Sequence, residues 1–213
     1  MNIFVLDEDP IAAAKMYCDK HIPKMCVEML QMMGSAVIRH GATPDMMPLT
    51  KKGTPLKGGY HNHPCTRWAG DSRANFLWVA HHAAALCEEY TLRFGKTHFC
   101  EKGIVHLCSM DSLIPEGKSL YSQTWLPLTP FALAMPDEFR PHLNKHIGAP
   151  FDVVPNDDFT FISHASGDDA VQAYRRYYHS KAFAKWEKGR PVPEWFDVVK
   201  QAALYDERMA VVK

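Results

Sequence analysis

Apolar residues recur at intervals of three and four between residues 76 and 94, which predicts a helix with one buried stripe. Asp71 or Ser72 is placed to cap the start of this helix, and Gly95 is placed to end it. The remaining faces carry histidine, arginine, glutamate and asparagine side chains, more polar chemistry than a scaffold helix needs. We therefore interpret residues 60–98 as a site built around a rigid helix.

The preceding residues show three shorter patterns. The apolar run 2–6 predicts a buried strand, and Asp9, followed by a proline, is a good helix N-cap. Helical spacing of apolar residues over 11–22 predicts a first helix that Pro23 should end or kink, and a second helical run follows over 25–41.

The rest of the chain is more interrupted. Residues 41–59 are rich in proline, glycine and lysine and predict a mobile loop, a lid that an anionic ligand could order. Residues 99–108 form a short apolar segment that fits a helix or a strand, and the proline-punctuated span 109–166 predicts mostly irregular structure. A helix is expected over about 168–188, and a last one opens near Pro193.

These patterns predict a mainly α fold: one compact helical domain over residues 1–213, with a short N-terminal strand and a loop-rich middle. A hydrophobic fraction of 46% and a charged fraction of 23% are ordinary for a globular protein. No apolar run is long enough for a bilayer, so we expect a cytoplasmic protein with no membrane partner. The six cysteines lack a C-x-x-C pair and are interpreted as buried reduced thiols.

The charge balance limits the function classes. The chain has 24 basic and 24 acidic residues, so its formal net charge is zero. Broad, nonspecific binding to nucleic acid needs an excess of positively charged side chains, which this chain lacks. If the chain binds DNA, it must do so through a local basic cleft.

Three kinds of site fit the residues. His61, His63 and Cys65 alternate, so an extended backbone would align them as zinc ligands, although Pro64 disturbs such a strand and we expect no cofactor. Cys65 paired with a neighbouring histidine would be a nucleophile, but groups two positions apart rarely reach that geometry.

The third kind of site recognises an anion and a base. Arg67 and Arg73, together with Lys20 and Lys24, could bind phosphate oxygens. The rings of Trp68, Trp78 and Tyr90 could stack on a base. The candidate substrate-binding residues are Lys20, Lys24, Arg67, Trp68, Arg73, Asn75 and Tyr90. No glycine-rich phosphate loop is present, so a common mononucleotide or dinucleotide fold is unsupported.

Several strings taken together resemble a family of small proteins from tailed bacteriophages. They span most of the chain outside the 41–59 loop and the tail: Asp19-Lys20-His21 with Lys24-Met25, His63-Pro64-Cys65 with Trp68, Ala85-Leu86-Cys87-Glu88-Glu89-Tyr90 with Arg93 and Gly95-Lys96-Thr97-His98, Met135-Pro136-Asp137-Glu138-Phe139, Tyr174-Arg175-Arg176-Tyr177-Tyr178, Phe183-Ala184-Lys185-Trp186 and Pro193-Glu194-Trp195. Pro23 departs from the family's pattern, in which an apolar residue continues the helix.

The chain also resembles the phage amino acid:DNA transferases that hypermodify thymine. The resemblance implies a reaction in the infected bacterial cytoplasm, in which an amine or amino acid displaces phosphate or pyrophosphate from an activated 5-hydroxymethyluracil in DNA. For such chemistry Asp19, His21 or His63 would take the proton of the amine. The base would flip out onto Trp68 or Tyr90.

Two other functions compete with this one. A metal-dependent hydrolase would use His61, His63 and nearby carboxylates, and a non-catalytic phage protein would bind a host partner through its aromatic C-terminal helix. The transferase hypothesis requires that the bend near His21 lie against the segment around His63 and the start of the long helix.

Overall fold

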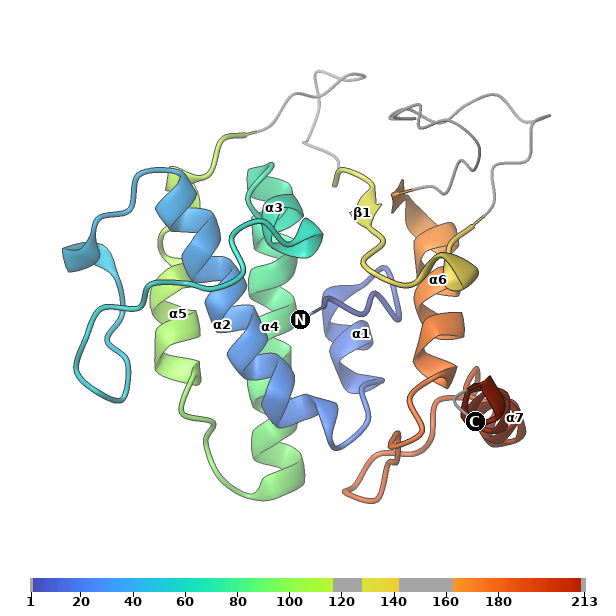
Figure 1. The fold of residues 1–213 in the computed structure, drawn as a ribbon. Coiled ribbons are helices and arrows are strands. Elements are labelled where there is room, and N and C mark those ends of the chain that lie inside the picture. The colour runs from blue at the N-terminus through green and yellow to red at the C-terminus, as the bar shows by residue number, and fades with distance from the viewer. Residues whose placement is uncertain (1, 117–127, 142–162, 212–213) are drawn as a thin grey trace.

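The structure is a computed structural model that describes residues 2–116, 128–141 and 163–211 (Figure 1). The elements in chain order are α1 (Pro10–Lys15), α2 (His21–Arg39), η1 (Pro44–Met46), α3 (Pro64–Ala69), α4 (Arg73–Phe94), α5 (Glu101–Cys108), η2 (Asp111–Leu113), β1 (Phe131–Ala132), η3 (Asp137–Phe139), β2 (His164–Ala165), α6 (Gly167–His179) and α7 (Val198–Val211). The two strands pair antiparallel, Phe131 with Ala165 and Ala132 with His164. The predicted mainly α fold is confirmed.

The long helix α4 lies at the centre of the molecule and packs against α1, α2 and α5 (Figure 1). Ser72 Oγ accepts a hydrogen bond from the Asn75 backbone N–H at 3.1 Å, and Gly95 ends the helix with a φ of 67°. Both predicted ends of this helix are therefore confirmed. Asp9 likewise caps α1 by accepting from the N–H groups of Ile11 and Ala12.

The predicted N-terminal strand does not form. The segment from Ile3 to Leu6 is buried without regular secondary structure, because side chains bind the polar groups that a sheet would pair. The Tyr17 hydroxyl accepts from the Phe4 N–H at 2.8 Å and donates to the Phe4 carbonyl at 2.9 Å. The segment thus passes through the core without a partner strand among the described residues.

Several predicted helix ends were wrong. The first helix stops at Lys15 and the next begins at His21, with Pro23 in its first turn, where no backbone N–H is needed. Pro23 therefore helps to begin α2 and does not break a helix. Residues 99–108 include a helix, α5.

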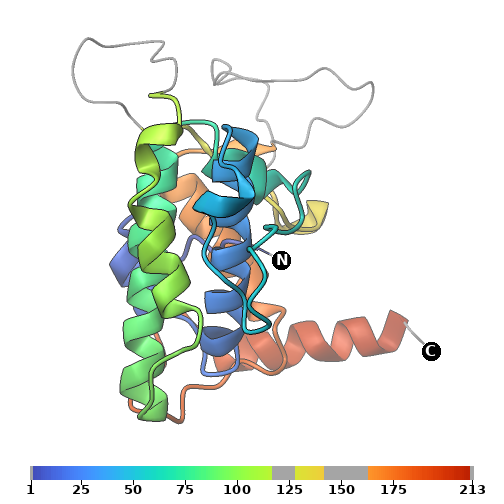
Figure 2. The ribbon, with the colours of Figure 1, turned by 90° about the vertical axis from the view of Figure 1, so that its left-hand side faces the viewer.

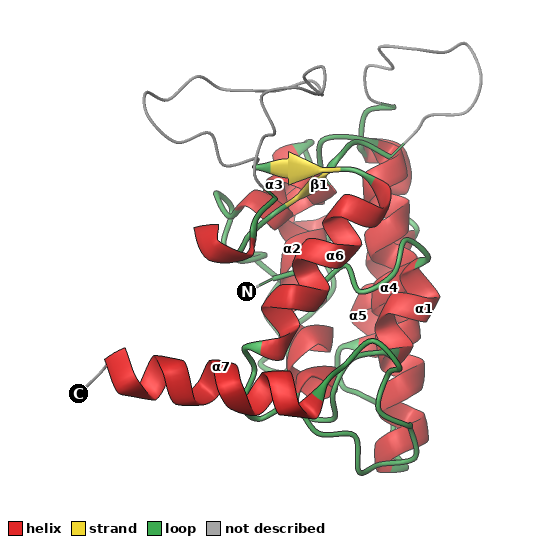
Figure 3. Ribbon diagram, turned by 90° about the vertical axis from the view of Figure 1, so that its right-hand side faces the viewer, coloured by secondary structure: helices red, strands yellow, loops and turns green. Residues whose placement is uncertain are grey.

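The C-terminal helices are shorter than predicted. Helix α6 ends at His179, and α7 begins only at Val198, with the aromatic segment between them packed on the core. Of the loop-rich middle, residues 117–127 and 142–162 lie outside the described residues. Helix α7 projects from the body of the molecule (Figures 2 and 3). None of the described helices has the length and apolarity that crossing a bilayer requires.

Candidate active site

A small cavity lies where the start of α2 meets the N-terminal segment and the end of α6. Its volume is about 170 Å³. It is lined by Asn2, Phe4, His21, Lys24, Met25, Glu28, Tyr177, Lys181 and Phe183. The lining combines a carboxylate, an imidazole, two ammonium groups and three aromatic rings, the side chains that act on or bind a nucleobase.

One face of α2 supplies the polar floor of this cavity. His21, Lys24 and Glu28 are spaced by three and four residues, so they project from the same side of the helix. The helix therefore supplies three of the polar groups of the cavity, and Asn2 and Lys181 supply two more from irregular segments.

Glu28 is the central carboxylate of the cavity. One of its oxygens accepts a hydrogen bond from the Asn2 backbone N–H at 2.9 Å, and the other lies 3.4 Å from Lys24 Nζ. Glu28 is only 8% exposed. A buried carboxylate held by a backbone donor and an ammonium is a fixed group that can take a proton or stabilise developing positive charge.

His21 is a neutral imidazole at the wall of the cavity. Its ring stacks on Phe4 with centroids 4.8 Å apart, and Nδ1 lies 2.7 Å from the Tyr178 hydroxyl. Burial, together with the positive charges of Lys24, Lys181 and Lys20, lowers the pKa of His21 to about 3. It is therefore uncharged at neutral pH.

His63 approaches the same region from α3. Its Nδ1 accepts a hydrogen bond from the Cys65 backbone N–H at 3.2 Å. The pKa of His63 is lowered, mainly by burial, and the nearby charge of Glu28 offsets only part of this effect. Cys65 contacts the N-terminal segment through Asn2, with 3.5 Å between Sγ and Oδ1. The predicted contact of the His63 segment and the start of α4 with the bend near His21 is not present. Arg39, at the end of α2, pairs with Asp71 just after α3, whereas Asp19, just before α2, pairs with Arg93 near the end of α4 (Figure 1).

Aromatic rings and ammonium groups from the second half of the chain complete the cavity. Lys181 Nζ lies 3.5 Å from the centre of the Tyr177 ring, and Lys20 Nζ lies 4.9 Å from that of Phe183. Lys20, Lys24 and Lys181 therefore lie around these aromatic rings. They form a local basic patch on a chain whose overall net charge is zero.

Two of the remaining candidates, Asp19 and Arg73, have structural roles at the ends of α4. Asp19 pairs with Arg93 at 3.1 Å and accepts from the Glu187 N–H at 2.6 Å. Arg73 pairs with Asp111 at 2.7 Å. Their charges are neutralised outside the cavity.

The other candidates pack or lie on the surface. Trp68 is buried against Trp78 and Phe131, Asn75 donates to the Trp68 carbonyl, Tyr90 stacks on Phe94, and Arg67 is exposed on α3. None of them lines the cavity, whose aromatic side chains are Phe4, Tyr177 and Phe183.

The sequence contained a signal for Glu28 that we did not use. Glu28 lies on the same helical face as His21 and Lys24, so the 3–4 spacing alone groups the three. Asn2 and Lys181 carry no such signal, because only the tertiary fold brings residues so distant in sequence together.

The metal site has no structural support. Because α3 begins at Pro64, residues 61–65 are not an extended strand, and His61 is exposed while Cys65 is buried. Within the described ranges, no group of three or more histidine, cysteine, aspartate or glutamate side chains is arranged to hold a metal ion.

Comparison with known proteins gives one match. The family model described as "Pyrimidine dimer DNA glycosylase" matches residues 1–102, slightly less than half of the chain. No curated protein and no solved structure is significantly similar to the chain. The matched range contains Asn2, His21, Lys24 and Glu28, and it ends before Tyr177, Lys181 and Phe183. The first half of the chain is therefore similar to a family of enzymes that act on pyrimidines in DNA.

Proposed function

We propose that this protein is an enzyme that acts on a pyrimidine base in DNA, and that the cavity around Glu28 is its active site. The observation that carries the proposal is the position of Glu28: a buried carboxylate, fixed by Asn2 and Lys24, inside the part of the chain that matches the glycosylase family. The resemblance to phage proteins and the hypermodification of thymine are parts of the proposal and rest on the sequence motifs alone.

The cavity suits a single base taken out of the duplex. A base inside the helix cannot reach a buried carboxylate, so the enzyme must flip it out and hold it by stacking. Phe183 is exposed and Tyr177 half-buried, so their rings offer surface for this purpose, while the buried Phe4 ring, with His21 stacked on it, forms the back wall. Lys20 and Lys24 lie where they can bind phosphates next to the flipped nucleotide.

Three ammonium groups around the hollow favour a reaction with an anionic leaving group. In the transfer reaction, the nitrogen of a small amine or amino acid bonds to the methylene carbon on C5 of an activated 5-hydroxymethyluracil. The C–O bond breaks, phosphate or pyrophosphate leaves with the electron pair, and Glu28 takes a proton from the nitrogen. Lys24 and Lys181 would stabilise the departing anion.

The family match favours a second candidate, cleavage of the bond between a pyrimidine and its sugar. In that reaction the base leaves with the electrons of the glycosidic bond and takes up a proton, and the Glu28 carboxylate stabilises the positive charge that develops on the sugar. Water then adds to the anomeric carbon and loses a proton, which gives an abasic sugar. Both reactions need the same carboxylate, so the site supports either and the substrate distinguishes them.

The test uses duplex oligonucleotides carrying plain thymine, a cyclobutane thymine dimer, or phosphorylated 5-hydroxymethyluracil, the last with a mixture of amino acids. Nucleoside mass analysis detects an aminated base in the transfer reaction and an abasic sugar or broken strand in the cleavage reaction. We expect Glu28→Gln to reduce the active reaction by about a hundredfold or more, a usual effect of losing an acid–base group. Glu88→Gln, an exposed carboxamide substitution on α4, is the matched control. If all three duplexes are unchanged, or if Glu28→Gln keeps full activity, the proposal is wrong.

A further inference from the structure

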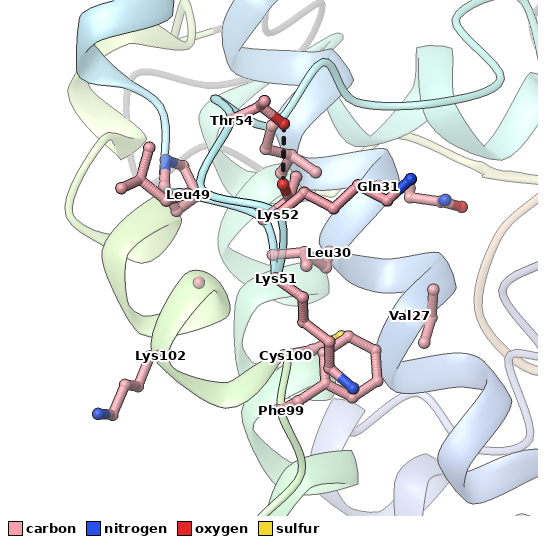
Figure 4. A pocket seen from close by; sticks show the side chains of 14 residues that line it. Val27, Leu30, Gln31, Leu49, Lys51, Lys52, Thr54, Phe99, Cys100 and Lys102 are labelled. Carbon is pink, nitrogen blue, oxygen red and sulfur yellow. Dashed lines mark hydrogen bonds between the residues drawn. The ribbon is translucent and has the colours of Figure 1, made fainter.

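A second, larger cavity lies farther along α2, on a different face from Glu28 and beneath the loop of residues 48–56 (Figure 4). Its volume is about 610 Å³, within the range of sites for small organic molecules. It is lined by Val27, Leu30, Gln31, Pro48, Leu49, Thr50, Lys51, Lys52, Thr54, Leu56, Phe99, Cys100, Lys102 and Gly103. The proposed reaction on DNA makes no use of this cavity.

The walls of the cavity are mainly apolar. Val27 and Leu30 come from α2, and Phe99 and Cys100 come from the turn just before α5 (Figure 4). Burial raises the pKa of the Cys100 thiol to about 12, so this side chain is neutral and behaves as a small hydrophobic group. Phe99 is 55% exposed, so part of its ring is open to solvent at the edge of the cavity.

The charges at the rim have one sign. Lys51, Lys52 and Lys102 line the cavity, and among the residues described here no acidic side chain does. Lys51 Nζ lies 3.9 Å from the centre of the Phe99 ring, so its ammonium stands over the apolar wall (Figure 4). The overall charge of the chain is balanced, and three cations without a lining carboxylate are therefore a local excess.

The loop over the cavity is fixed by its own hydrogen bonds, and a glycine leaves space in the opposite wall. The loop is closed by an antiparallel bridge between Leu49 and Pro55 and by a hydrogen bond of 2.9 Å between the Thr50 and Thr54 hydroxyls. Gly103 lies in α5, where glycine costs about 1 kcal/mol relative to alanine. A Cβ at this position would lie 2.9 Å from Leu30 Cδ1 and 3.8 Å from Pro48 Cβ, so a side chain here would enter the cavity.

We propose that this cavity binds a small amphipathic anion, a molecule with an apolar body and one carboxylate or similar group. The apolar walls would bury the body, and Lys51 and Lys52 would bind the anionic end at the rim. A DNA backbone is a poorer occupant, because its closely spaced phosphates would lose hydration against walls that offer few polar partners.

The experiment uses the full-length protein and three ten-carbon probes that differ only in the head group: decanoate, decanol and decylammonium. Binding is followed by displacement of 8-anilinonaphthalene-1-sulfonate, a fluorescent amphipathic anion, and by the midpoint of thermal unfolding. We expect decanoate to bind at one molecule per chain and to raise the midpoint, decanol to bind more weakly, and decylammonium to bind least. Equal binding of decanoate and decylammonium, or several equivalent sites, would overturn the proposal.

Variants locate the site. Lys51→Gln with Lys52→Gln should weaken decanoate binding by about three- to tenfold, as expected for losing two partly exposed charged contacts, and leave decanol binding unchanged. Lys185→Gln with Lys200→Gln removes the same charge from exposed positions away from the cavity and should have no effect. Gly103→Leu should abolish binding of both probes, and its unfolding curve shows whether the fold is retained. Displacement of the fluorescent anion by duplex DNA at the same lysines would instead assign this surface to nucleic acid.

Discussion

Glu28 and His21 line the same cavity, but their surroundings give the two side chains different chemical properties. Glu28 contacts a backbone donor and an ammonium, so its carboxylate is held in one orientation. His21 lies between Phe4 and Tyr178 in a region where burial and three lysines oppose its protonation. A pKa of about 3 makes His21 a weak proton acceptor, so its ring is better suited to shape the wall of the cavity. The histidine type alone had suggested the reverse, because its ordinary pKa lies near neutrality.

Buried histidines also determine how the protein responds to acid. Burial lowers the pKa of His82 to about 4 from an ordinary value of 6.5. Below pH 6.5 the unfolded chain therefore binds a proton that the folded chain does not, so stability is fully present above that pH and is lost as the pH falls toward 4. At pH 5 this one group should cost about 2 kcal/mol of unfolding free energy relative to pH 7.

Urea unfolding at pH 7 and pH 5 measures this loss. In His82→Gln the loss between the two pH values should be smaller than in the wild type by about 2 kcal/mol, because the variant has one buried imidazole fewer to titrate. His61→Gln, at an exposed position, should retain the full wild-type loss. An unchanged pH dependence in His82→Gln would show that His82 does not carry this effect.

At the level of elements, sequence pattern predicted best where one local rule decided the outcome. The ends of α4 follow from a side-chain cap at Ser72 and a left-handed residue at Gly95, and both were predicted. The strand over residues 2–6 was predicted from an apolar run, but no neighbouring strand exists in the described chain to pair with it, and Tyr17 binds Phe4 instead. An apolar run reports burial, and only the tertiary fold decides what binds its backbone.

Gly95 offers a clean measurement of one such rule. Its φ is 67°, and a Cβ added there would meet no atom within 4 Å, so substitution changes the backbone preference without a steric clash. Gly95→Ala should therefore lower the free energy of unfolding by about 1 kcal/mol. Gly95→Asn should cost less, because asparagine tolerates this conformation better.

Chemical denaturation of the three proteins gives the comparison. An alanine variant as stable as the wild type would mean that the end of α4 does not need a left-handed residue. That result would count against the rule that a glycine in the left-handed conformation ends a helix, the rule from which the end of α4 was predicted.

At the scale of the whole molecule, the candidate site joins two halves of the chain that sequence reasoning treated separately. The family match ends at residue 102, whereas Tyr177, Lys181 and Phe183 close the cavity from the other end of the sequence. His21, His63 and Lys24 were identified from residue type and position, and two of these three line the cavity. The aromatic walls were assigned to Trp68 and Tyr90, because a sequence does not tell which aromatic side chains the core will bury.

The balanced charge of the molecule leads to a prediction about DNA binding. The proposed contact surface has three lysines, Lys20, Lys24 and Lys181, around the cavity. Neutralising about three phosphates gives a slope of about −3 when the logarithm of the duplex-binding constant is plotted against the logarithm of salt concentration. Fluorescence anisotropy with a short duplex at several salt concentrations measures this slope.

Replacing the three lysines by glutamine should bring the slope close to zero, because those phosphate contacts no longer release counterions. The matched control removes three lysines from the other cavity, with Lys51→Gln, Lys52→Gln and Lys102→Gln, and should leave the slope at its wild-type value. If instead the control flattens the slope and the first variant does not, DNA lies over the loop of residues 48–56. The cavity around Glu28 would then not be where DNA binds, and the proposal that Glu28 acts on a base would be wrong.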